Sequence, residues 1–179
     1  MDRVQLAQWY FEDGQDYLKR YRVLFYSDSH DFQSIKSRRV KCYVDLRVTL
    51  EAILKSAICL AAKDEEDGET LLKRVKAYGH RIGELSKEAV PLLGGDESVL
   101  AALAHCDEAP IDLRYQAEAV PFRSGDDRPY YATIGDDAWL ATLERFAQNA
   151  LDHLDASLRQ FSKVVDARTL WDEILATKR

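Results

Sequence analysis

The stretch of sequence that decides the fold spans residues 40–62 and reads VKCYVDLRVTLEAILKSAICLAA. Its apolar residues recur every three or four positions, which places them on one face of an α-helix and predicts a long amphipathic helix at the centre of the core. They are Val40, Val44, Leu46, Leu50, Ile53, Leu54, Ala57, Ile58 and Ala61. Arg47, Glu51 and Lys55 follow one another at intervals of four residues, so we expect them to form a solvent-exposed ladder of charges.

The same spacing predicts further helices on both sides of this one. Long helices are expected over residues 4–25 and 136–165, and the central helix should begin within residues 32–35. Residues 107–127 should be irregular, with an extended segment over residues 117–122. Shorter helices, separated by Ser, Asp, Gly and Pro residues that interrupt helices, are expected over residues 69–77, 80–90, 97–105 and 168–176.

Length and composition indicate one domain. The 179 residues, 46% of them hydrophobic, suffice for one well-buried core and are too few for two independent cores. We therefore predict an all-α, single-domain antiparallel helical bundle over residues 1–179, with four or five principal helices and short extra helices. Its core should join the second and last long helices through Leu50, Leu54, Ile58, Phe146, Leu151 and Leu154.

The charge balance restricts the partners. A net charge of −6 and a pI near 5.3 argue against a protein whose whole surface binds nucleic acid, because the phosphate backbone is bound by clustered Lys and Arg. RNA could still be bound locally by two basic clusters, at residues 19–22 and at residues 36–41, the second of which contains Arg38 and Arg39. Tyrosines neighbour both clusters and could stack on bases. The alternative is that the tyrosines face the core and the cations face water. The longest apolar run covers only residues 57–62, and no secretory signal is visible, so we expect a cytoplasmic protein without membrane contact.

The cysteine and histidine pattern predicts no metal site and no cofactor. Cys42, Cys59 and Cys106 lack CxxC spacing, and the first two are 17 residues apart, roughly 25 Å along one helix, so we expect reduced and mostly buried thiols. The four histidines have no i, i+3 or i, i+4 pair that would suit a metal ion. His105-Cys106 is the one adjacent pair of ligand types, and we expect it to lie at a helix end, with metal binding as the alternative.

Three segments, in this order along the chain, resemble the HEPN-type helical bundles. Residues 45–56 (DLRVTLEAILKS) are similar to the long HEPN helix, in which a glutamate and a lysine sit around small and aliphatic core residues. Residues 78–85 (YGHRIGEL) are similar to the Gly-His entry to the following helix. Arg114-Tyr115, after Leu113, is similar to the Arg-Tyr element that precedes the final long helix.

This resemblance implies a bundle that commonly dimerises and acts in RNA cleavage, phage defence, toxin–antitoxin pairs or alongside nucleotidyltransferases. Catalytic members carry an arginine followed, after four to six intervening positions, by a histidine at the start of the last helix. Arg145 and His153 have seven residues between them, and Arg74 and His80 have five but lie on either side of Gly79, away from the last helix. We therefore expect a non-catalytic interaction module with a protein partner. The alternatives are a divergent metal-independent endoribonuclease and an unrelated helical-bundle binding protein.

Several polar residues are candidates for binding. Arg145, Asn149 and His153 share one helical face, which could hold a phosphate or simply be the solvated side of the helix. Arg114 and Tyr115 could contact a nucleotide, or could pack and pair within the protein. Large apolar residues near the chain ends predict that at least one end segment joins a homodimer interface; they are Trp9, Tyr10, Trp171 and Leu175.

Overall fold

The computed structural model describes residues 2–27, 32, 34–63, 66–109 and 128–161. Within these ranges the chain forms helices and no strand, as the apolar spacing predicts. The elements, in order, are α1 (Arg3–Tyr26), α2 (Ile35–Ala61), α3 (Gly68–Ala77), α4 (Ile82–Ala89), the 3-10 helix η1 (Val90–Leu93), α5 (Glu97–Ala104), the 3-10 helix η2 (His105–Glu108), α6 (Arg128–Ala132) and α7 (Asp137–Phe161).

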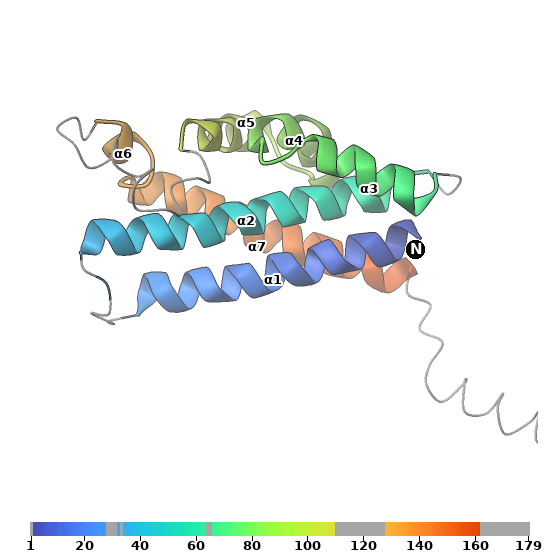
Figure 1. Ribbon diagram of the computed structural model, residues 1–179, viewed down its shortest axis with the longest axis horizontal. Helices are drawn as coiled ribbons and strands as arrows, with labels where there is room; N and C mark the ends of the chain where they lie inside the picture. The colour runs from blue at the N-terminus through green and yellow to red at the C-terminus, as the bar shows by residue number, and fades with distance from the viewer. Residues whose placement is uncertain (1, 28–31, 33, 64–65, 110–127, 162–179) are drawn as a thin grey trace, which may run out of the picture.

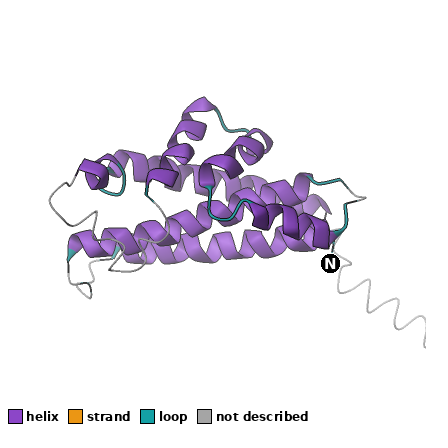
Figure 2. Ribbon diagram, turned by 45° about the horizontal axis from the view of Figure 1, so that its top comes forward, coloured by secondary structure: helices purple, strands orange, loops and turns teal. Residues whose placement is uncertain are grey.

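The long helices α1, α2 and α7 run beside one another and make up the body of the bundle (Figure 1). Helices α1 and α2 form an antiparallel hairpin, and α7 runs in the same direction as α2. The shorter helices α3, α4 and α5 follow one another across the side of α2 that faces away from α1, as Figures 1 and 2 show. Helix α2 is therefore covered on more than one side.

Close packing joins α1 to α2. Gly14 is buried on α1, and a Cβ atom at this position would lie only 3.1 Å from Cγ1 of Ile53 on α2. The hydroxyl of Ser56 also donates a hydrogen bond of 2.8 Å to the Ala7 carbonyl. The glycine thus allows the two backbones to approach, which outweighs its low helix propensity.

Short polar side chains set the beginnings of the long helices. Asp2 accepts a hydrogen bond from the amide of Gln5 at 2.7 Å, and Ser34 accepts one from Ser37 at 3.0 Å. Asp136 does the same for Ala138 at 2.8 Å, at the start predicted for the last helix. Such N-caps satisfy amides that have no partner within the helix.

The predicted core is confirmed. Leu50, Leu54, Ile58, Phe146, Leu151 and Leu154 are all buried and belong to one apolar cluster built mainly from α1, α2 and α7. The three cysteines are free and buried, also as predicted. Burial raises the pKa of Cys42 to about 11 and of Cys59 to about 12, so these thiols stay protonated near neutral pH.

Some sequence predictions differ from the structure or lie outside the described residues. Helix α4 begins at Ile82 rather than His80, because Gly79 adopts a left-handed φ of 58° and turns the chain there. The short helix α6 was not predicted. The expected extended segment over residues 117–122, the helix over residues 168–176, and Arg114, Tyr115, Trp171 and Leu175 lie outside the described residues. Every helix in the described ranges is too short or too polar to cross a membrane.

Candidate functional site

The charged ladder of α2 is buried, so its predicted exposure is wrong. Arg47 is 3% exposed, Glu51 9% and Lys55 7%. These side chains contact other parts of the chain rather than water: Arg47 reaches η2 and the turn before α4, Glu51 contacts His80 in that turn, and Lys55 lies near Tyr10 of α1. Buried charges are stable only when they are paired and hydrogen-bonded, so this face must hold a polar network.

Arg47 ties two distant segments to α2. Its Nη1 donates to the Cys106 carbonyl in η2, and its Nη2 donates at 2.7 Å to the His80 carbonyl in the turn before α4. Nη2 also lies 3.2 Å from Oδ1 of Asp107. Asp107 in turn accepts hydrogen bonds of 3.0 Å from the amides of Ile82 and Gly83, which fixes the start of α4.

The next turn of α2 carries a cluster formed by Glu51, Lys55 and His80. Oε1 of Glu51 is 2.5 Å from the Lys55 ammonium, and Oε2 is 2.7 Å from Nδ1 of His80. The Glu51 side chain is 11% exposed, whereas the His80 side chain is 58% exposed. A buried carboxylate therefore lies behind a half-exposed imidazole.

This geometry defines the chemistry open to His80. Glu51 contacts Lys55 through Oε1 and Nδ1 of His80 through Oε2, so Nδ1 is the ring nitrogen that the carboxyl group engages. The other ring nitrogen, Nε2, is then the one that can take up or give a proton at the surface. A carboxylate that orients an imidazole is the arrangement used by many acid–base sites.

Helix α1 closes the same cluster from the other side. The Lys55 ammonium lies 5.8 Å from the centre of the Tyr10 ring. Burial, followed by the nearby Cys59 and Glu51, raises the pKa of Tyr10 to about 12. The phenol is therefore neutral near pH 7, and it contributes a ring face and a dipole rather than a charge.

The two predicted arginine–histidine pairs are not brought together. Arg145 and Asn149 are exposed on α7 and line a groove of about 390 Å³ beside the Gly94-Gly95 turn. His153, one helical turn after Asn149, lines a different groove of about 190 Å³ beside Leu92 and Leu93 of η1. Within the described residues, the side chains of Arg145, Asn149 and His153 take part in no hydrogen bond or ion pair, which is typical of a solvated helical face.

Arg74 and His80 have separate partners. Arg74 lies 3.4 Å from Glu66 and 3.7 Å from Glu88, both near the ends of the short helices. His80 is held by Glu51 on α2. The five-residue spacing of the pair therefore does not produce a shared phosphate clamp in the described structure.

Arg38 and Arg39 hold the chain together at one end of the bundle. Arg38 donates to the carbonyls of Leu24 and Phe25, the last turn of α1, with a distance of 2.8 Å to the first. Arg39 donates to the Ile134 carbonyl at 3.0 and 2.9 Å and pairs with Asp137 at 2.7 Å. These contacts occupy Nε and Nη2 of both guanidinium groups, which leaves fewer donors for an RNA phosphate.

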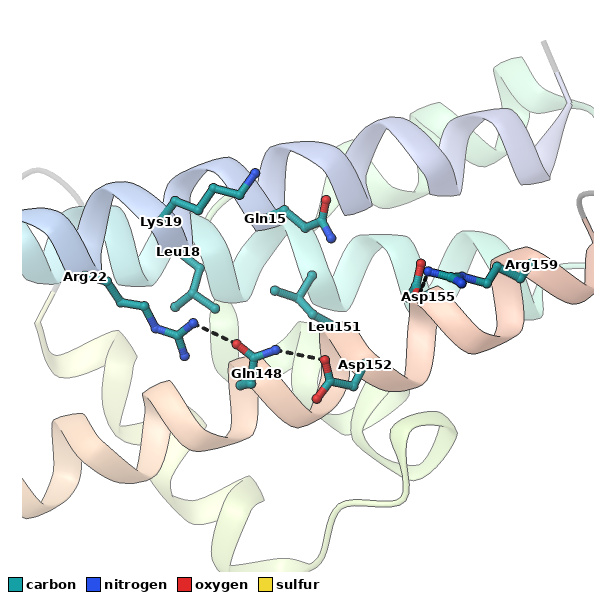
Figure 3. A pocket seen from close by; sticks show the side chains of 9 residues that line it. All are labelled: Gln15, Leu18, Lys19, Arg22, Gln148, Leu151, Asp152, Asp155 and Arg159. Atoms are coloured by element: carbon teal, nitrogen blue, oxygen red, sulfur yellow. Dashed lines mark hydrogen bonds and ion pairs between the residues drawn. The ribbon is translucent and has the colours of Figure 1, made fainter.

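A polar groove of about 270 Å³ lies along the line where α1 and α7 meet (Figure 3). Arg22 on α1 donates to Gln148 on α7 at 2.8 Å, and Gln148 donates to Asp152 at 2.8 Å. Farther along α7, Arg159 and Asp155 pair at 2.8 Å. Of the contacts drawn in Figure 3, the bond between Arg22 and Gln148 joins the two helices, and the other two lie within α7.

In the described ranges, no group of three or more His, Cys, Asp or Glu side chains is placed to hold a metal ion. His105, beside Cys106, binds the Ala132 carbonyl at 2.9 Å and Glu108 at 3.0 Å instead. No family model, no curated protein and no solved structure matches this chain.

Sequence reasoning missed the contacts among the residues that it had already singled out. Glu51, Lys55 and His80 lie in two of the segments that resemble HEPN proteins, and the 2.7 Å contact of Glu51 with His80 joins those segments. The burial of these charges could have been predicted from residues 45–56, where aliphatic residues stand on both sides of each charged residue. A helix with apolar residues on several faces is covered on several faces.

Proposed function

We propose that this protein is a non-catalytic, HEPN-like interaction module that works with a protein partner. The contact between Glu51 and His80 supports the HEPN-like assignment, because it links two of the three segments on which the resemblance rests. The partner systems that the resemblance implies are phage defence, toxin–antitoxin pairs and nucleotidyltransferase-associated systems.

The observation that carries the non-catalytic proposal is the separation of Arg145 from His153. RNA cleavage without a metal needs a group that moves a proton beside a cation that stabilises the phosphate. These residues are eight positions apart, roughly 12 Å of helix rise, and they line different grooves. Neither groove contains both groups.

The test is RNA cleavage by the purified protein in the presence of a metal chelator. We expect intact RNA with the wild-type chain, and no difference in the Arg145→Ala and His153→Ala variants. Both residues are exposed, so these variants should fold normally. Metal-independent cleavage that either substitution abolishes would overturn the proposal and favour a divergent endoribonuclease.

One observation favours the ribonuclease alternative at a different residue. His80 is the half-exposed histidine whose Nδ1 is bound by the buried Glu51, so it is better arranged for proton transfer than the exposed His153. If RNA is cleaved, His80→Ala and Glu51→Gln should abolish the activity, and His153→Ala should serve as the control. Cleavage that survives His80→Ala would remove this alternative.

Partner binding requires its own measurement. Co-expression with a toxin or nucleotidyltransferase encoded next to this chain should give a complex that co-purifies at fixed stoichiometry. If the neighbouring proteins are of neither class, or if they do not bind, the remaining alternative is a helical bundle with an unrelated binding role.

A further inference from the structure

The histidines in the described ranges differ in what their ring nitrogens contact. Both ring nitrogens of His105 have partners within the chain. His153 is exposed, and neither of its ring nitrogens has a partner among the described residues. In His80, Nδ1 lies 2.7 Å from Oε2 of Glu51, and the side chain is 58% exposed. Of these histidines, His80 is therefore the one with one nitrogen held and the other at the surface.

Both the backbone and the ring of His80 are held in place. Its carbonyl accepts a hydrogen bond of 2.7 Å from Nη2 of Arg47, a residue that is only 3% exposed. Gly79, directly before it, turns the chain with a φ of 58°, and Glu51 holds the ring. A nucleophile that is already fixed in one orientation loses less freedom when it reacts.

The Glu51 carboxyl group selects the ring nitrogen that can react. An ionised carboxylate only accepts hydrogen bonds, so it matches the imidazole tautomer that carries its hydrogen on Nδ1. The lone pair of that tautomer is on Nε2, and a carboxylate behind the ring makes this lone pair more nucleophilic. Oε1 of Glu51 is 2.5 Å from the Lys55 ammonium, which offsets the negative charge that would otherwise repel an anionic reagent.

The chain around His80 is basic, although the protein as a whole is acidic. Residues 73–81 contain four cations and no carboxylate, in a chain with a net charge of −6. The cations are Lys73, Arg74, Lys76 and Arg81. Arg81, next to His80, is held by two hydrogen bonds of 3.0 Å to carbonyls at the end of α3. Such a segment attracts small anions to the imidazole.

We propose that His80 is a phosphoryl-acceptor site, which takes a phosphoryl group on Nε2 from a phosphoramidate, a donor with a phosphorus–nitrogen bond. A positioned imidazole with a free lone pair forms covalent bonds to such centres. The product places negative charge and acceptor oxygens at the turn before α4, beside Arg81. This modification goes beyond the proposed interaction module and does not depend on it, because it is a single transfer to the protein rather than turnover.

The atoms and electrons of this transfer balance without a further reagent. The Nε2 lone pair attacks phosphorus and forms the new nitrogen–phosphorus bond. The phosphorus–nitrogen bond of the donor breaks, and its electron pair leaves with the nitrogen. In phosphoramidate this nitrogen is already protonated near neutral pH, so it departs as ammonia. The ring becomes cationic and keeps its hydrogen on Nδ1, opposite the carboxyl group of Glu51.

Treatment of the full chain with potassium phosphoramidate tests the proposal. At mildly alkaline pH, mass spectrometry should show phosphorylation of His80 at least about tenfold faster than that of His153. His153→Ala is the matched control and should react at His80 like the wild type. In His80→Ala, which should fold because the residue is exposed, the fast reaction should be lost. Equal rates at His80 and His153, or fast labelling that survives His80→Ala, would overturn the proposal.

Phosphorus NMR tests the positioning role of Glu51. The wild type should give the Nε2 product alone. Replacing Glu51 and Lys55 together by glutamine removes both charges of the pair. The rate at His80 should then fall to that at His153, and product should also form on Nδ1. The wild type in urea should lose its preference in the same way, which keeps the test decisive if the double variant does not fold. Fast, Nε2-specific reaction in a folded double variant or in urea would overturn the proposal.

Discussion

Replacing Arg47 by methionine should be among the most destabilising single changes in this chain. Methionine has a similar length and can fill the apolar part of the site, but it cannot donate hydrogen bonds. The carbonyls of Cys106 and His80 would then lose the charged donor that they share. Asp107 would be affected less, because it is partly exposed and keeps its bonds to the start of α4.

The size of the effect follows from these contacts. A hydrogen bond to a charged group contributes about 1.5–3 kcal/mol, so the two carbonyls together lose about 3–6 kcal/mol. Nε of Arg47 is buried and has no hydrogen-bond partner, so removing it relieves a desolvation cost and offsets roughly 1 kcal/mol of the loss. We therefore expect the free energy of unfolding to fall by about 2–5 kcal/mol, as when one partner of a buried ion pair is lost.

Equilibrium unfolding in urea measures this difference. Arg159→Met is the matched control, because Arg159 is 77% exposed and pairs with Asp155 on the same helix. An exposed pair of this kind contributes less than about 0.5 kcal/mol. A loss below roughly 1 kcal/mol in Arg47→Met would show that the carbonyls find water or other donors, and would refute the reasoning.

Three further predictions concern the core, the thiols and the helix caps. Leu54→Ala should cost on the order of 2–5 kcal/mol in the same assay, because Leu54 is 0% exposed; a cost below ~0.5 kcal/mol would contradict its place in the core. Cys42, Cys59 and Cys106 are buried and protonated, so a thiol reagent at mildly alkaline pH should label them only after denaturant is added. Rapid labelling of the native chain would count against their burial. Asp67 and Asp96 cap α3 and α5, and hydrogen bonds from Thr70 and Ser98 respectively lower the pKa of each carboxyl. A carboxyl whose pKa is lower in the folded state stabilises the protein at pH values above its unfolded pKa, and this stabilisation is lost as the pH falls. The difference in free energy of unfolding between the wild type and Asp67→Ala should therefore shrink between about pH 5 and pH 2. An advantage that stays constant over that range would refute the assignment of this cap.

The sequence by itself determined the helices and the apolar core. Apolar residues at helical spacing located α1, α2 and α7 and identified Leu54 and Phe146 as core residues, because this spacing places them on one face of a continuous helix. The acidic residues Asp136 and Asp137 located the start of α7 within one residue, since a side chain such as that of Asp136 acts on amides close to it in the chain. Both signals are local, so they can be read from a single segment.

Only the tertiary structure decided what covers each face. The spacing of Arg47, Glu51 and Lys55 shows that they share a side of α2, but it does not show whether that side meets water or protein. Carbonyls of η2 and of the turn before α4, more than thirty residues away in the chain, bind Arg47, and His80 from that turn binds Glu51. The same limit applied to Arg145 and His153, which share a helical face but line separate grooves, because α2 and η1 border the groove at His153 and the Gly94-Gly95 turn borders the groove at Arg145. Burial and pairing depend on surfaces supplied by distant segments, and local periodicity carries no information about which segments those are.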